Sequence, residues 1–187
     1  MMNALLSSKT RQSGVALVTG LIFMVILTII VIAALRSAML EERMAANALN
    51  RQIGLQAAEA ALRDAELRIL GNPAAGVAPA APFDPFDPTA FTADCATDGL
   101  CSYAADGLRW KNVDWDAVGE EPTATIDGVA QQPRYIIEIA NIPVGVVGGI
   151  CPKILYRITA RGVGRDNAAV FLQTMVRHLP ASCPTLS

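Results

Sequence analysis

An uninterrupted apolar run near the amino terminus constrains this chain more than any other feature. The residues from Val15 to Leu35 include no charged side chain, and a short basic leader with Lys9 and Arg11 ends just before them at Gly14. A helix rises about 1.5 Å per residue, so the run is long enough to cross a hydrocarbon core of about 30 Å. The sequence therefore predicts a membrane-spanning helix here.

The run does not end as a secretory signal peptide ends. Such a peptide has about 7–15 apolar residues followed by a cleavage site of small residues. Here the apolar residues pass directly into 36–44, which keeps a helix-forming composition and contains no breaker. We therefore expect this helix to stay in the mature chain and to continue beyond the membrane.

Past the membrane segment, apolar residues recur three and four positions apart, which is the spacing of one helix face. These residues are Leu55, Ala58, Leu62, Ala65 and Ile69. Gly54 is a weak point, because glycine inside a helix costs about 1 kcal/mol relative to alanine. Gly71 and Pro73 supply a glycine after the last turn and a proline beyond it. We expect one helix from Val15 to Leu70 with this stripe packed on a domain.

The last third of the chain predicts β-strands over 134–139, 154–161 and 170–177, because these segments are rich in β-branched and aromatic residues. Glycines and Asp-Asn in 162–169 predict a turn between the last two strands. Residues 71–133 hold many prolines, glycines and aspartates without a sustained period, so irregular structure is expected there. The predicted fold class is α+β, a long N-terminal helix packed on a C-terminal antiparallel β-sheet.

The sequence contains no pattern typical of an enzyme or a metal site. The single histidine, His178, has no obvious acid or nucleophile partner, and no pair of cysteines has the C-x2–4-C spacing of a zinc site. The aspartates at 94, 98, 114 and 116 do not match the calcium-loop pattern, so turn and solvent roles are favoured. A net charge of −2 supplies no basic stripe for nucleic acid. We expect no enzyme activity, no cofactor, no metal and no nucleic-acid partner.

Three stretches match a known family in specific residues as well as in hydropathy. They are Gly14-Val15-Ala16-Leu17-Val18, Leu40-Glu41-Glu42-Arg43-Met44-Ala45-Ala46-Asn47 and Gln56-Ala57-Ala58-Glu59-Ala60-Ala61-Leu62-Arg63-Asp64-Ala65-Glu66. Over residues 11–68 the chain resembles the N-terminal part of the PilX-type minor pilins of Gram-negative type IV pilus systems. The resemblance is weaker over 71–150, and the phrase at 156–162 again is similar to minor pilins of this kind. It implies a type IV pilin-like fold.

The resemblance also implies a processing site and a location. A prepilin peptidase would cut on the cytoplasmic side between Gly14 and Val15, and the new amino terminus at Val15 would be methylated. Gly14 suits the cut because a residue without a Cβ lets the backbone approach the peptidase closely. The protein would sit in the inner membrane as a single-pass protein with a periplasmic globular domain, and would enter the pilus on assembly.

The same resemblance divides the chain and names its partners. The divisions are a prepilin leader (1–14), the transmembrane part of the helix (15–35), its periplasmic continuation (36–70) and a pilin globular domain (71–187) with an irregular region (71–133) and a β-meander (134–178). The implied partners are other minor and major pilins, the inner-membrane pilus assembly platform, the prepilin peptidase, the membrane and a tip adhesin.

One position departs from the pattern of major pilins. They carry a glutamate at the fifth mature position, which is Thr19 here. That glutamate is inferred to neutralise the amino-terminal ammonium of the subunit above, inside an apolar filament core where a lone charge is costly. A subunit with no neighbour above has no ammonium to neutralise, so Thr19 suits a priming or tip position. The plainer interpretation is a tolerated hydroxyl that bonds back to its own helix.

All four cysteines follow the membrane segment, in the part that the resemblance places outside the cytoplasm, where disulfides persist. Charge alone leaves the orientation of the span ambiguous, because basic residues flank it on both sides. Four cysteines permit three pairings. A turn signal between Cys95 and Cys101 favours these two as a local pair, which leaves Cys151 and Cys183 to each other.

Two other functions stay open beside the minor pilin. A type II secretion pseudopilin has the same architecture and serves secretion. A single-pass anchored binding protein would not be cut at Gly14, so the mass of the mature amino terminus distinguishes it from the first two.

Overall fold

The computed structural model describes residues 13–71, 89–141 and 154–178. In chain order the elements are α1 (Ser13–Leu70), β1 (Leu100–Cys101), α2 (Arg109–Asn112), β2 (Arg134–Ile139), β3 (Ile154–Val163) and β4 (Ala169–His178). The chain divides into two compact units, Met1–Asn47 and Ala48–Ser187. Most of the predicted leader, the proline-rich segment at 73–88, Cys151 and Cys183 lie outside the described residues.

The predicted long helix is confirmed. α1 has 58 residues and ends where the sequence indicated. Gly71 has φ 71°, the left-handed conformation that glycine adopts most easily, and its N–H donates to the Leu67 carbonyl at 2.7 Å. Glycine therefore closes the last turn of the helix as expected.

The sheet has the order β1-β2-β3-β4. β2 pairs antiparallel with β3, and β3 with β4 in an unbroken register from Ile154 opposite His178 to Val163 opposite Ala169. These three strands are the predicted meander, each within two residues of its expected ends. The fourth strand, β1, was not predicted, because two residues carry no period; it pairs parallel with β2 and makes the sheet mixed.

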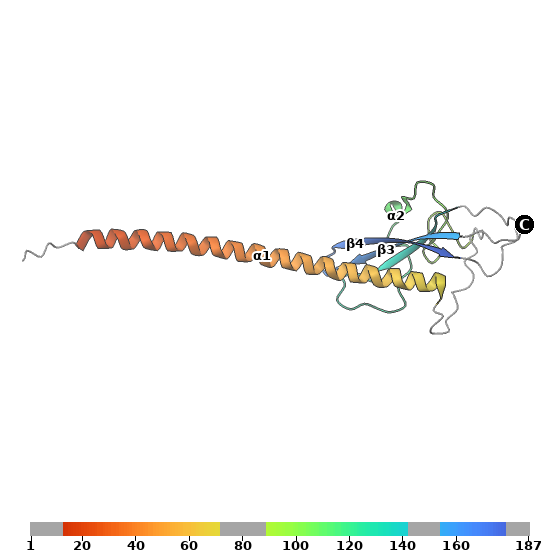
Figure 1. Ribbon diagram of the computed structural model, residues 1–187, viewed down its shortest axis with the longest axis horizontal. Helices are drawn as coiled ribbons and strands as arrows, with labels where there is room; N and C mark the ends of the chain where they lie inside the picture. The colour runs from red at the N-terminus through yellow and green to blue at the C-terminus, as the bar shows by residue number, and fades with distance from the viewer. Residues whose placement is uncertain (1–12, 72–88, 142–153, 179–187) are drawn as a thin grey trace, which may run out of the picture. The chain divides into compact units, whose positions relative to one another are not determined.

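The helix face that packs on the sheet is made of small residues. Ala57, Ala58, Ala61 and Ala65 are fully buried, as is Ile69. The predicted stripe was therefore right at 58, 65 and 69 but wrong at Leu55, which is exposed, while Leu62 is half-buried. In Figure 1 the last turns of α1 run alongside β3 and β4. Alanines let the backbones of the helix and the sheet approach closely, which leucines at these positions would prevent.

Glycines make the closest contact between helix and sheet. A Cβ on Gly162 would overlap the carbonyl oxygen of Gly54, and a Cβ on Gly164 would overlap Asn50. Asn50 is buried, and its side-chain oxygen accepts a 3.0 Å hydrogen bond from the Asp166 N–H in the β3–β4 turn. Gly54, a weak point for an isolated helix, therefore leaves the space into which the end of β3 packs.

The sheet buries residues on both faces. Toward α1 lie Tyr135, Ile137, Ile158 and other apolar side chains, which form the main core with Ala61, Ala65 and Ile69. The opposite face carries Ile136, which packs with Trp115 and the two bonded cysteines in a second, smaller cluster. The loops between β1 and β2 thus cover the face that the helix leaves open.

Candidate functional site

The first unit of the chain presents a helix with unburied apolar side chains. From Val15 to Leu35 every large apolar side chain is exposed by roughly half or more. Among the described residues α1 is the one helix whose length and composition would allow it to cross a membrane. Such a surface is costly in water, so its place is a lipid bilayer or a contact with other apolar helices.

The predicted processing residues lie at the start of this helix. Gly14 and Val15 are exposed, and a Cβ placed on Gly14 would meet no atom within 4 Å. The Thr19 hydroxyl donates to the carbonyls of Val15 at 3.0 Å and Ala16 at 3.1 Å. Thr19 therefore satisfies its polar group within its own helix, which is compatible with an apolar environment.

The structure brings together the local cysteine pair. Cys95 and Cys101 are bonded, with Cα atoms 4.4 Å apart, and both are fully buried. Cys101 lies in β1, so the disulfide holds the 95–101 loop against the neighbouring strand β2. The predicted Cys95–Cys101 pair is confirmed, and the Cys151–Cys183 pair, outside the described residues, stays a prediction.

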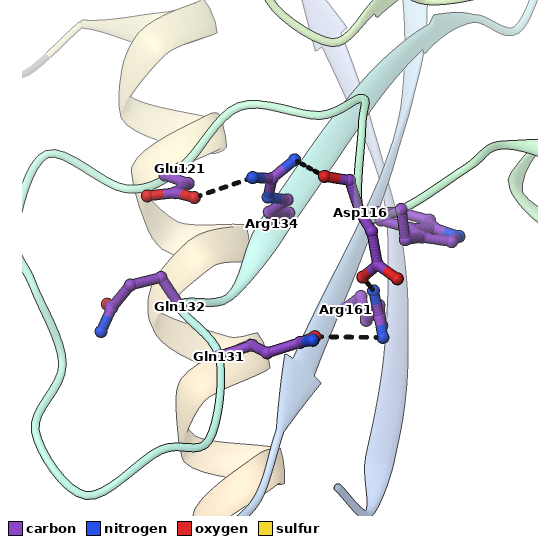
Figure 2. A pocket seen from close by; sticks show the side chains of 7 residues that line it. Asp116, Glu121, Gln131, Gln132, Arg134 and Arg161 are labelled. Carbon is purple, nitrogen blue, oxygen red and sulfur yellow. Dashed lines mark hydrogen bonds and ion pairs between the residues drawn. The ribbon is translucent and has the colours of Figure 1, made fainter.

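A polar cavity of about 290 Å³ opens on the loop-covered face of the sheet (Figure 2). Arg161 of β3 binds Asp116 at 3.0 Å and donates to Gln131 at 3.3 Å. Arg134 of β2 binds Glu121 at 3.1 Å and donates to the Asp116 carbonyl at 3.1 Å. Each guanidinium has a carboxylate partner from the loop, so these contacts hold the loop against the sheet.

A second cavity, of about 400 Å³, is lined by three aspartates and Arg109. Each aspartate accepts a backbone N–H two residues ahead: Asp94 from Ala96 at 3.2 Å, Asp106 from Leu108 at 3.1 Å and Asp114 from Asp116 at 3.1 Å. These are turn-forming contacts, as predicted for Asp94 and Asp114. Across the described residues, no group of three or more histidines, cysteines, aspartates and glutamates is placed to hold a metal ion.

One buried carboxylate was not foreseen. Glu138 of β2 is 1 % exposed, and neither of its oxygens has a hydrogen-bond partner among the described residues. Burial raises the pKa of Glu138, while the nearby Arg157 and Arg109 oppose the shift and Asp106 adds to it. Its signal in the sequence was a lone acid with an isoleucine on either side, within a strand that is mostly apolar.

The arrangement described above agrees with family comparisons. Residues 13–63 match the family PilX N-terminal, and residues 87–178 match the family Type IV pilus assembly protein PilX C-term. The two matches follow each other along the chain and cover most of it. No curated protein and no solved structure matches the chain. The PilX pilins are structural components rather than enzymes. The chain belongs to the PilX family and is a type IV pilus assembly minor pilin.

Proposed function

We propose that this minor pilin is inserted in the inner membrane through α1, cut by prepilin peptidase between Gly14 and Val15, and methylated at Val15. Its 1–14 segment is then a leader, 15–35 the transmembrane part, 36–70 the periplasmic continuation and 71–187 the globular domain. The observation that carries the proposal is α1, one helix from Ser13 to Leu70 whose large apolar side chains from Val15 to Leu35 are exposed.

The start of the helix supports the processing step. A peptidase needs an accessible scissile bond, and both Gly14 and Val15 are exposed, with open space where a Cβ of residue 14 would lie. A cut at this point leaves the whole apolar segment in the mature protein. The segment can then leave the membrane only by exchanging lipid for other apolar helices, which is what incorporation in a filament provides.

Thr19 supports a priming or tip position within the pilus. The mature helix has no acid at the position where major pilins neutralise a neighbour's ammonium. The Thr19 hydroxyl bonds to carbonyls of its own helix, which fits both a priming or tip position and the plainer interpretation of a tolerated hydroxyl. A subunit without the acid is best placed where no subunit lies above it. The partners are then the major and minor pilins, the inner-membrane assembly platform and a tip adhesin.

Mass spectrometry of the mature amino terminus tests the processing proposal. The expected product begins with N-methylated Val15. Gly14→Val should block cleavage, because a branched side chain prevents close approach of the peptidase, and immunoblotting should show the longer form in the membrane.

Gly20→Val is the matched control, since Gly20 also has no atom within 4 Å of a Cβ position but lies inside the helix. It should leave the processed size unchanged. A product of normal size from Gly14→Val, or an unmodified Met1 on the mature protein, would contradict the assignment and favour an anchored protein that is not cut.

A further inference from the structure

Four charged side chains interrupt the apolar surface of the first part of α1. Between Ser13 and Asn50 they are Arg36, Glu41, Glu42 and Arg43, and all four are exposed. None has an opposite charge three or four positions away, which is the spacing at which side chains pair along a helix. No ion pair found among the described residues uses any of them. The Ser37 hydroxyl donates to the Glu41 carboxylate at 3.5 Å, but this is a neutral partner. Glu41 and Glu42 therefore have no cationic partner among the described residues.

The two signs lie on opposite faces of the helix. Arg43 follows Arg36 by seven residues and lies only about 20° from it around the axis. Glu41 and Glu42 lie about 140° and 240° around from Arg36, so their midpoint is nearly opposite the arginines. The helix thus has an arginine face and a glutamate face at the same height.

The shapes of the two faces also differ. The arginine face continues with the bulky residues Ile29, Ile32 and Leu40. From residue 34 onward the glutamate face continues with Ala34, Ala38 and Ala45, while Ile30 and Val31 lie on it one turn earlier. Small residues let a neighbouring helix approach closely in a membrane, and bulky ones fill the groove that small ones leave.

We propose that two copies of this chain pair at the periplasmic edge of the membrane through residues 29–45 of α1, with the arginine face of one copy against the glutamate face of the other. Two copies inserted in the same orientation have parallel helices. Each arginine then lies within about 9 Å of each glutamate along the helix axis. A small axial offset between the two helices shortens this separation. Unlike faces meet, so the contact is heterologous and leaves one face of each kind free. The inference deepens the assembly function proposed above and rests on its membrane anchoring, without requiring cleavage at Gly14.

Co-purification of two differently tagged full-length copies tests the pairing. The copies are expressed together, and membranes are solubilised in a non-ionic detergent at low salt, because charge pairing near water is screened by salt. The wild-type copies should co-purify. Arg36→Glu with Arg43→Glu should lower recovery of its own tagged partner by about tenfold, and Glu41→Arg with Glu42→Arg should do the same.

The decisive arm mixes the two reversed variants. One variant presents only acidic faces and the other only basic faces, so neither variant should co-purify with a second copy of itself. The mixed pair should recover most of the wild-type yield. Restoration also shows that both variants are folded and inserted. Arg51→Glu with Glu59→Arg is the control, because these exposed charges lie on α1 beyond the proposed contact and their reversal should change nothing.

Three results would overturn the pairing: no co-purification of wild-type copies, full recovery from a reversed variant alone, or no recovery from the mixture. The size of the protein on the same immunoblot reports cleavage separately. If pairing fails while the chain is processed normally, the proposed function stands and the pairing is refuted. If cleavage fails while pairing is normal, the pairing stands and the proposed processing is refuted.

Discussion

Gly162 of β3 lies so close to Gly54 of α1 that no side chain fits between them. A Cβ built on Gly162 would overlap the Gly54 carbonyl oxygen and would lie 2.9 Å from the Ala58 Cβ. The neighbours that block it are mainly backbone, which cannot rotate away as a side chain can. The two glycines therefore fix the distance between helix and sheet at the end of β3.

Gly162→Ala should destabilise the globular unit by about 3 kcal/mol, since the added methyl forces the helix and sheet apart. Thermal melting of the full-length protein in detergent, together with resistance to protease, measures the effect. Gly20→Ala is the control, because the same methyl there meets no atom within 4 Å. Equal melting of Gly162→Ala and wild type would show that the contact is looser than described.

Glu138→Gln should stabilise the protein at neutral pH. Burial raises the folded-state pKa of Glu138 above 4.5, so the folded protein binds this proton more readily than the unfolded chain does. The charged form is therefore penalised above the raised pKa, and the penalty disappears as the pH falls toward 4.5. The advantage of Glu138→Gln should be largest at neutral pH and shrink on acidification.

Unfolding midpoints in denaturant between pH 4.5 and 8 measure this dependence. The exposed Glu59→Gln serves as the control and should run parallel to wild type across the range. A Glu138→Gln variant less stable than wild type at pH 8 would mean that the attraction of Arg157 and Arg109 outweighs the cost of burial.

Peptide mapping without reduction should recover Cys95 joined to Cys101 and, as a prediction from the sequence, Cys151 joined to Cys183. Cys183→Ser should then lower stability by about 2–5 kcal/mol, as loss of a disulfide does in a small exported domain, and lower the protein level. Recovery of Cys183 as a free thiol from periplasm-derived protein would refute the second pair.

Thr19→Glu should give no gain in piliation if this subunit primes or tips the filament, because a carboxylate in the apolar core would find no ammonium. A subunit in the shaft would instead incorporate better. The measurement is the ratio of this pilin to major pilin in sheared filaments. Thr28→Glu is the control for a misplaced acid, since Thr28 also bonds back to its own helix, at 2.7 Å to the Val25 carbonyl. A higher ratio for Thr19→Glu alone would overturn the tip position.

The long helix and the meander could be predicted because each carries its own local signal. The charge-free run, the glycine at 71 and the β-branched and aromatic residues in 134–139 depend only on neighbours in sequence. The helix face that contacts the sheet could not be predicted so well. Leucine at 55 fits an apolar stripe, but the close approach of Gly162 and Gly164 selects the face with Gly54, Ala57 and Ala61 instead.

The rest of the candidate site depended on pairings that sequence spacing does not display. β1 has only two residues, and it forms because it pairs with β2 and because the Cys95–Cys101 disulfide holds one of its two residues. Glu138 is buried because loops from distant parts of the chain, including the segment with Arg109, cover the face of the sheet opposite α1. The local cysteine pair was predictable because a turn separates its members by only six positions.

The glycine and alanine contact between α1 and β3 has a mechanical consequence. Its stability depends on dispersion between closely spaced atoms, and a gap of about 0.5–1 Å already forfeits a quarter to a half of that attraction. Long side chains can stay in touch while two elements slide apart, but backbones cannot. Under load this joint should therefore stay stiff until it separates abruptly, instead of yielding by degrees.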